Sequence, residues 1–152
     1  MFSNIAYTYS YNSVSKAIKI TDVSAKEYIR YLEDSFLLYE IKYFSYSLKE
    51  QNNHKKKIYI IDNGFMLLNY SFTKNSEALF ENLVFSELIK RGYEVYFYNR
   101  NFECDFIARK NDKLVAIQVC YELNGKNTKR EINVLKKLTF NVDKKYIITY
   151  NQ

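Results

Sequence analysis

Apolar residues recur at helical spacing through residues 13–36, with one interruption at 19–22. Before the interruption the apolar positions are Val14, Ala17 and Ile18, and after it they are Ala25, Ile29, Leu32 and Phe36. This pattern predicts two helices joined by a tight turn, with Thr21 or Asp22 capping the second. Residues 37–44 alternate and predict a strand. Helix, turn, helix and β-ribbon is the order of a winged helix, so residues 1–48 are expected to form a partial one.

Residues 49–57 are polar and rich in lysine, which predicts a linker or an exposed loop between two domains. A short apolar strand at 58–61 ends at the turn signal Asp62-Asn63-Gly64. An amphipathic helix is predicted over 76–90, ending before Gly92. The remaining predicted elements are three strands, a helix and a buried strand, at 93–98, 103–109, 113–121, 128–138 and 145–150. This order predicts an α/β domain with helices on a mixed sheet over residues 58–152.

A two-residue turn at Asn111-Asp112 would join the last two of the three neighbouring strands into a hairpin. The register that this turn sets places opposite one another the pairs Lys110–Lys113, Asp105–Gln118 and Glu103–Cys120. The last two pairs share one polar face, because side chains alternate along a strand. Cys104 falls on the opposite, apolar face from Cys120, so no disulfide is expected and a reducing compartment fits.

A carboxylate opposite an amide, near a helix that carries Glu81, suits a hard divalent cation such as Mg²⁺. Such an ion can polarise a phosphodiester and supply an attacking hydroxide. Zinc is disfavoured, since Cys120 is alone on that face and the only histidine, His54, lies in the predicted linker. The alternative is that Glu103 and Asp105 form the solvent side of an edge hairpin.

The chain has 152 residues and a net charge of +6, which permits contact with phosphate without requiring it. No apolar run approaches the roughly 18 residues that would cross a bilayer. The first residues do not form a secretion signal, so a cytoplasmic protein with no membrane partner is expected. The glycines, at 64, 92 and 125, are too scattered to build the phosphate loop of an ATPase.

Three segments taken in order resemble a known family: Phe80-Glu81-Asn82, Glu103-Cys104-Asp105-Phe106 and Ile117-Gln118-Val119-Cys120-Tyr121. The family they resemble is the C-terminal domain of archaeal and bacterial AAA-type ATPases, which is placed in the PD-(D/E)xK nuclease-like superfamily. Residues 59–64 and 130–132 also fit this domain, and residues 28–34 resemble the winged-helix segment that precedes it. The resemblance implies a restriction-endonuclease-like core preceded by a partial winged helix, with an ATPase domain as partner in cis or in trans.

By this resemblance Glu81 corresponds to the helix acid and Asp105 to the central aspartate, while Gln118 and Cys120 correspond to the two ends of the (E/Q)xK element. Glu81, Asp105 and Gln118 would then be the catalytic residues and the ligands of Mg²⁺. Gln118 is a neutral ligand. Cys120 replaces the lysine whose cation would offset charge developing on the phosphate, and a thiol cannot do this.

A relocated cation is one way to compensate for that loss, and Arg130, Lys129 and Lys126 are the candidates on the following helix and loop. For Arg130 the alternative is an exposed arginine that pairs with Glu131. The same resemblance therefore leaves two functions open. One is a catalytically degenerate accessory module through which an ATPase engages a target such as DNA. The other is an active Mg²⁺-dependent DNA endonuclease.

Two further clusters are candidates for nucleic-acid contact. Lys55, Lys56 and Lys57 would grip phosphates if the predicted linker is exposed, and a solvated loop is the alternative. Lys26 and Arg30 lie on the second predicted helix and would face a major groove. In linker winged helices, by contrast, that surface commonly packs on a neighbouring domain. These clusters keep a third function open, a stand-alone DNA-binding regulator.

Overall fold

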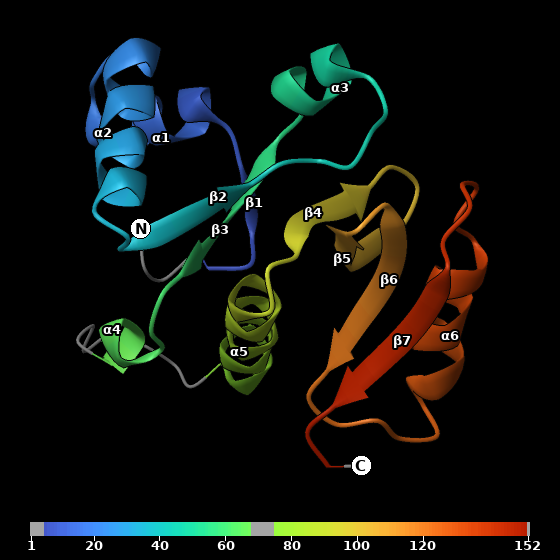
Figure 1. The fold of residues 1–152 in the computed structure, drawn as a ribbon. Helices are drawn as coiled ribbons and strands as arrows, with labels where there is room; N and C mark the ends of the chain where they lie inside the picture. Colours follow the sequence, from blue (N-terminus) through green and yellow to red (C-terminus); the bar gives the residue numbers. More distant parts are fainter. Residues whose placement is uncertain (1–4, 68–74, 152) are drawn as a thin grey trace. The chain divides into compact units, whose positions relative to one another are not determined.

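The computed structural model describes residues 5–67 and 75–151, and the chain divides into two compact units, Met1–Phe72 and Thr73–Gln152. Each unit has its own sheet (Figure 1). The division falls well after residues 49–57, where the sequence predicted the linker. The coarse prediction of helices combined with sheets is confirmed.

The first unit combines a helical pair with a small antiparallel sheet of strand order β1-β3-β2. Its elements are β1 (Thr8–Tyr9), α1 (Tyr11–Ile18), α2 (Asp22–Asp34), β2 (Leu38–Ile41), α3 (Leu48–Asn53), β3 (Lys56–Ile60) and α4 (Gly64–Leu67). Lys19 ends α1 in the left-handed conformation, with φ of 57°. The Thr21 side chain accepts the Ser24 N–H and caps α2, as predicted. Ala25 and Ile29 of α2 are buried, whereas Ile18 and Phe36 lie exposed beyond the predicted apolar face.

The segment predicted as a linker belongs to the first unit and is ordered as α3 and β3. β3 pairs antiparallel with β2, from Leu38 opposite Ile60 to Ile41 opposite Lys57. All five residues of β3 are buried. The predicted strand at 58–61 is therefore the second strand of the ribbon and not the first strand of the following domain. Lysine-rich composition concealed it, because lysine is usually exposed.

The second unit holds a four-stranded sheet of order β4-β5-β6-β7, with two helices. Its elements are α5 (Ser76–Lys90), β4 (Glu94–Asn99), β5 (Glu103–Lys110), β6 (Lys113–Cys120), α6 (Thr128–Lys136) and β7 (Lys144–Thr149). β4, β5 and β6 are antiparallel neighbours, and β7 runs parallel to β6 after the α6 crossover. The helix and strand order predicted from residue 76 onward is confirmed.

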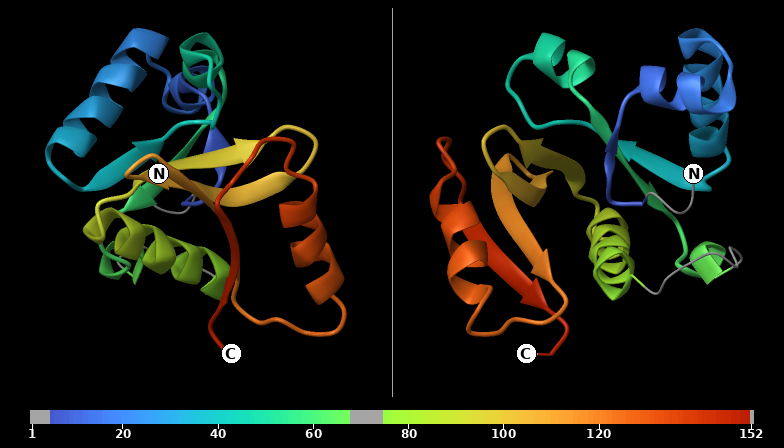
Figure 2. Two further views of the ribbon diagram at one scale, coloured as in Figure 1. Left: turned by 45° about the vertical axis from the view of Figure 1, so that its right-hand side comes forward. Right: turned by 180° about the vertical axis from the view of Figure 1, so that it is seen from behind.

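The two helices cover opposite faces of this sheet (Figures 1 and 2). On the α5 face, the rings of Phe85 and Phe106 lie 6.2 Å apart between centroids. On the α6 face, Lys145 Nζ donates to the Leu135 carbonyl at 2.7 Å. β7 is at one edge and is half-buried to exposed along its length, so the buried final strand that the sequence predicted is wrong.

Candidate functional site

The β5–β6 hairpin has the register that its turn predicted. Asn111 and Asp112 both adopt positive φ, 50° and 61°, which a two-residue hairpin turn of the primed type requires. Backbone pairing then runs from Lys110 opposite Lys113 to Phe106 opposite Ile117. Both strands continue beyond this point, β5 beside β4 and β6 beside β7.

The two central strands part where the predicted Asp105–Gln118 pair begins. Here Val119 N–H donates to the Asp105 carboxylate, with 2.8 Å between N and Oδ2. A side chain thus accepts a hydrogen bond that a backbone carbonyl would take in a regular ladder. Asp105 is only 8% exposed, so its carboxylate is held inside the fold by this contact. The alternative that both acids face solvent on an edge hairpin is therefore wrong for Asp105. It holds for Glu103, which is exposed.

Buried polar groups gather on the α6 face around this opening. Gln118 and Cys120 are each 8% exposed, and Glu131 of α6 is 3% exposed. The opposite face of the same strands carries fully buried apolar side chains such as Cys104 and Phe106. The polar face predicted for the hairpin therefore exists, but α6 covers it.

Gln118 has an oxygen that the fold does not use. Its Oε1 atom is buried and makes no hydrogen bond within the described residues. Leaving a buried polar atom without a partner costs about 1–3 kcal/mol. Most buried polar groups in folded proteins are paired, so packing alone does not explain why this oxygen is buried here.

Cys120 occupies the position that the resemblance assigns to a lysine. Its Sγ lies 3.5 Å from Asn127 Nδ2 and donates to the Glu122 carbonyl at 3.2 Å. Burial raises the pKa of the thiol, and the negative charge of Glu131 raises it further. At neutral pH this position therefore holds an uncharged thiol in place of a cation.

Arg130 and Glu131 form an ion pair close to this thiol. The Arg130 Nε and terminal nitrogen lie 2.8 and 2.7 Å from Glu131 Oε1. The hydrogen bond and charge of Glu131 raise the pKa of Arg130. The arginine that was a candidate relocated cation is therefore engaged with its neighbour, as the alternative held. Sequence reasoning did not count Glu131 as a site acid, although its position one turn before the buried Leu135 could have shown that it faces the sheet.

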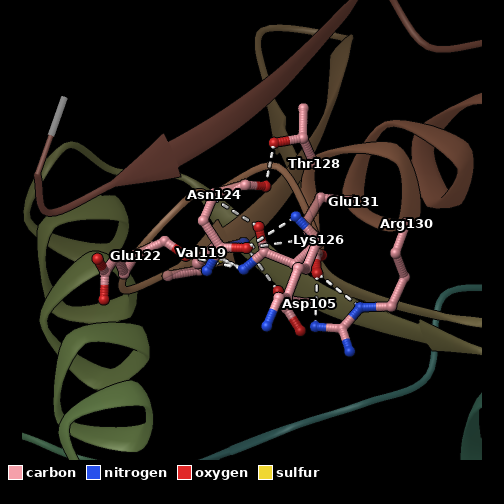
Figure 3. A network of polar contacts seen from close by, with 10 residues as sticks. Asp105, Val119, Glu122, Asn124, Lys126, Thr128, Arg130 and Glu131 are labelled. Atoms are coloured by element: carbon pink, nitrogen blue, oxygen red, sulfur yellow. Dashed lines mark hydrogen bonds and ion pairs between the residues drawn. The ribbon is translucent and has the colours of Figure 1, made fainter.

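The loop from β6 to α6 is shaped by its own asparagines (Figure 3). The Asn124 carbonyl accepts the Thr128 hydroxyl at 2.6 Å, and its side chain accepts the Lys126 N–H at 3.0 Å. Asn127 closes the loop by donating to the Glu122 carbonyl at 2.8 Å. These bonds fix the start of α6 and leave Lys126 and Lys129 exposed on the surface next to Arg130.

The third predicted ligand, Glu81, comes from a different helix. Glu81 is carried by α5, which covers the face opposite to that of Asp105 and Gln118. Glu77, one turn earlier on α5, is the acid of that helix whose charge raises the pKa of Cys120. The shared face of Asp105 and Gln118 is as predicted, and the role of Glu81 as a third ligand stays a prediction.

The residues present fit a Mg²⁺ ion poorly. Asp105 already accepts a backbone N–H, and the nearest acid on α6, Glu131, is paired with Arg130. Across residues 5–67 and 75–151, no three His, Cys, Asp or Glu side chains are grouped so as to hold a metal ion. We therefore derive no catalytic step through a metal at this site.

In the first unit, the predicted lysine cluster is divided between surface and interior. Lys55 is exposed, whereas Lys57 is 1% exposed and Lys56 is 7% exposed. The Lys56 ammonium donates to the carbonyls of Asn52 and His54, both at 3.0 Å. Burial lowers its pKa. This corrects the expectation of three exposed lysines that grip phosphates together.

The predicted groove-reading residues of α2 are exposed. The Arg30 guanidinium lies 3.6 Å from the carboxylate of Asp34, one turn along the same helix. Lys26 is also on the surface. The structure thus leaves these two cations accessible, with Arg30 partly neutralised by its neighbour.

A second polar cluster of the first unit is centred on Glu40 of β2. Its carboxylate accepts hydrogen bonds from the hydroxyls of Tyr9 and Tyr11. Glu33 of α2 accepts the Glu40 N–H at 2.9 Å, and burial raises the pKa of Glu33. These bonds join β1, α2 and β2, so the cluster is explained by the packing of the unit.

No helix in the described ranges is both long enough and apolar enough to span a bilayer.

Comparison with known proteins identifies two consecutive domains. Residues 1–76 match a family described as "Domain of unknown function (DUF8612)", and residues 76–152 match "Domain of unknown function (DUF4143)". An uncharacterized protein of Methanocaldococcus jannaschii is 40% identical over 143 residues, covering 88% of this chain and 31% of the relative. An uncharacterized protein of Haemophilus influenzae is 34% identical over 125 residues, covering 80% of this chain and 30% of the relative.

The chain therefore spans about a third of the length of these curated relatives. No solved structure matches this chain. The two family matches meet at residue 76, close to the boundary between the compact units. The chain thus belongs to two families joined in tandem, the DUF8612 domain in its first half and the DUF4143 domain in its second.

Proposed function

We propose that this chain is an accessory module of an AAA-type ATPase. In this proposal the first unit is a winged helix, with β2 and β3 as the wing. The second unit is a nuclease-like domain of the PD-(D/E)xK type that has lost catalysis and engages a target. The order of one helix, three antiparallel strands, a crossover helix and a parallel strand supports the second assignment.

One observation carries the proposal that catalysis is lost. At the position of the motif lysine, Cys120 is buried beneath Asn127 as a neutral thiol with a raised pKa. The nearest guanidinium, that of Arg130, is already paired with Glu131. Charge developing on a phosphate would therefore meet neither a lysine nor an unengaged arginine at this point, and such charge stabilisation is usually a large part of catalysis.

The partner part of the proposal rests on length and on the resemblance. The curated relatives are about three times as long as the part that aligns with this chain. This leaves ample room in them for an ATPase domain, and the three glycines of this chain form no phosphate loop of their own. The module would then link target engagement to a motor domain in cis or in trans.

DNA is the target that the charges favour. The net charge is +6, and exposed cations stand at Lys126, Lys129 and Arg130 beside the opening between β5 and β6. On the first unit, Lys26 and Arg30 are also exposed. Each phosphate contact that releases a counterion would add to a salt-dependent affinity.

A cleavage assay tests the catalytic part of the proposal. The chain is incubated with branched, linear and single-stranded DNA in Mg²⁺ and in Mn²⁺, beside the variant Asp105→Ala. We expect no cleavage by either protein. Cleavage by the natural chain that is lost in Asp105→Ala would instead make it a metal-dependent endonuclease.

A binding titration tests the target. We expect DNA affinity to fall steeply with salt, and the double variant Lys126→Ala with Lys129→Ala to reduce both affinity and salt slope. Lys136→Ala with Lys137→Ala, at the far end of the same helix, is the matched control and should change both less. Affinity that is indifferent to salt would remove DNA as the target, and binding with no ATPase partner in the natural context would favour a stand-alone regulator.

A further inference from the structure

The edge strand β7 presents an apolar row that the fold leaves open. β6 and β7 pair with Ile117 beside Tyr146 and Val119 beside Ile148, so these side chains share the α5 face. Tyr146 is 46% exposed, and Leu83 of α5 is also largely exposed across from it. A depression of about 520 Å³ lies between them, bounded by Leu83, Leu88, Val115, Ile117, Tyr146 and Ile148.

This row extends past the end of β7 onto Tyr150. The rings of Tyr121 and Tyr150 stack at 4.9 Å, and the Phe80 ring meets the Tyr150 ring edge-on at 5.9 Å. Tyr150 nevertheless remains exposed. Parallel strands are normally buried on both faces, so an open apolar row on a parallel edge strand is a feature that a partner would cover.

The outer edge of β7, from Lys144 to Ile148, is a second feature of this strand. In the described part of the second unit β7 is the last strand of the sheet, with β6 on one side. An edge strand offers unpaired N–H and C=O groups that can pair with another strand. An apolar row and an open edge on the same strand favour a strand as the occupant over a helix, which would leave the backbone groups unpaired.

We propose that a second copy of this chain covers this edge, with its β7 running antiparallel to the first about a two-fold axis. The sequence of the strand is complementary to itself in this arrangement. Centred on Ile147, the pairing sets Tyr146 opposite Ile148, Lys145 opposite Thr149, and Lys144 opposite Tyr150. The two sheets would join into one continuous sheet, with the two apolar rows side by side on its α5 face.

Charge favours this orientation and this occupant. Antiparallel pairing keeps the two lysines of each strand away from those of the other, whereas parallel pairing would set lysine opposite lysine, which is destabilising. Lys144 instead meets the Tyr150 ring of the second copy, a favourable cation–π contact.

Mass in solution tests the proposal on the full 152-residue chain. Sedimentation equilibrium should give a species of twice 18.3 kDa that dissociates on dilution. Tyr146→Glu should give the monomer mass, because it buries a charge opposite Ile148. Tyr28→Glu, at a comparably exposed tyrosine on α2, is the matched control and should leave the mass unchanged.

The register is tested by a charge exchange that does not depend on packing. Tyr150→Lys sets a lysine opposite Lys144 of the other copy, and the two-fold axis repeats this pair of like charges. The substitution should raise the dimer dissociation constant about tenfold. Adding Lys144→Glu to Tyr150→Lys should restore most of the lost affinity. A monomer at every concentration, a dimer that Tyr146→Glu leaves intact, or no recovery in the double variant would each overturn the proposal. These readouts involve no DNA, so they are independent of the proposed function.

Discussion

The two faces of the second sheet are built from the same strands but carry different chemistry. The α5 face meets its helix through apolar groups, of which Phe85 and Phe106 are the clearest pair. The α6 face instead buries Asp105, Gln118 and Glu131 beneath its helix. Burying polar groups is unfavourable unless they are hydrogen-bonded, so an apolar α6 face would have folded at least as well.

The difference indicates what each face is for. The α5 face is explained by packing alone, whereas the α6 face keeps a carboxylate in a strand opening and an amide oxygen without a partner. Features that cost stability without an evident packing gain are typical of functional or formerly functional sites. Stability measurements on variants of each face would break or sharpen this contrast.

The largest effect is expected on the α5 face. Phe106→Ala removes a fully buried ring and should lower the free energy of unfolding by about 3–5 kcal/mol, since cavities form where large core side chains are lost. Denaturant unfolding of the chain measures this, and Phe106→Leu should lose distinctly less. If both variants lost less than the α6-face variants, the contrast between the faces would be reversed.

A smaller loss is expected at Asp105. Asp105→Ala removes the acceptor of the Val119 N–H and should cost about 1–3 kcal/mol, because that buried donor loses its partner. Asp105→Asn keeps an acceptor oxygen at the same place and should cost less. A gain in stability for Asp105→Ala would mean that the carboxylate is a strained functional group whose bond to Val119 contributes nothing to folding.

Gln118 should behave in the opposite sense. Gln118→Met keeps nearly the same shape and removes the buried amide, so stability should be unchanged or higher by up to about 1 kcal/mol. Thermal unfolding beside the natural chain measures the change, with Gln118→Glu as a companion that should be destabilised by burying a charge. A clear loss of stability in Gln118→Met would show that Oε1 has a partner in solution.

The smallest effect concerns pH and Cys120. Burial raises the pKa of this thiol, so the folded state holds its proton more tightly than the unfolded state does. Its contribution is fully present below the ordinary thiol pKa and is lost as pH rises through the raised value. The free energy of unfolding of the natural chain should therefore fall more steeply in mildly alkaline solution than that of Cys120→Ser. Parallel slopes in the two proteins would mean that the thiol is not protected by the fold.

Local signals predicted much of the second unit. The helix at 76–90 begins and ends where its pattern and Gly92 indicated, and the Asn111-Asp112 turn fixed the hairpin register. These features depend on neighbouring residues, which sequence patterns record directly. The side-by-side positions of Asp105 and Gln118 followed from that register alone.

Features that depend on distant residues were missed. The sequence assigned β3 to the wrong domain, because its pairing with β2 is set by tertiary contacts. The buried residues Lys56 and Lys57 also have the composition that is typical of a solvated loop. It also left open whether Asp105 faces solvent, although a parallel strand after a crossover helix implies that the helix covers one face of the sheet. Glu131 was overlooked for the same reason.

The position of β7 also affects how the chain can acquire its structure during synthesis. The β5–β6 hairpin brings together residues that are close in sequence, so it can form early, whereas β7 can pair only after the whole of α6 has been made. Until then the apolar β6 strand has an unpaired edge in the nascent polypeptide, and such a state is prone to aggregate with other incomplete chains. The interval before β7 is made is therefore the one in which aggregation of the growing chain is expected to be greatest.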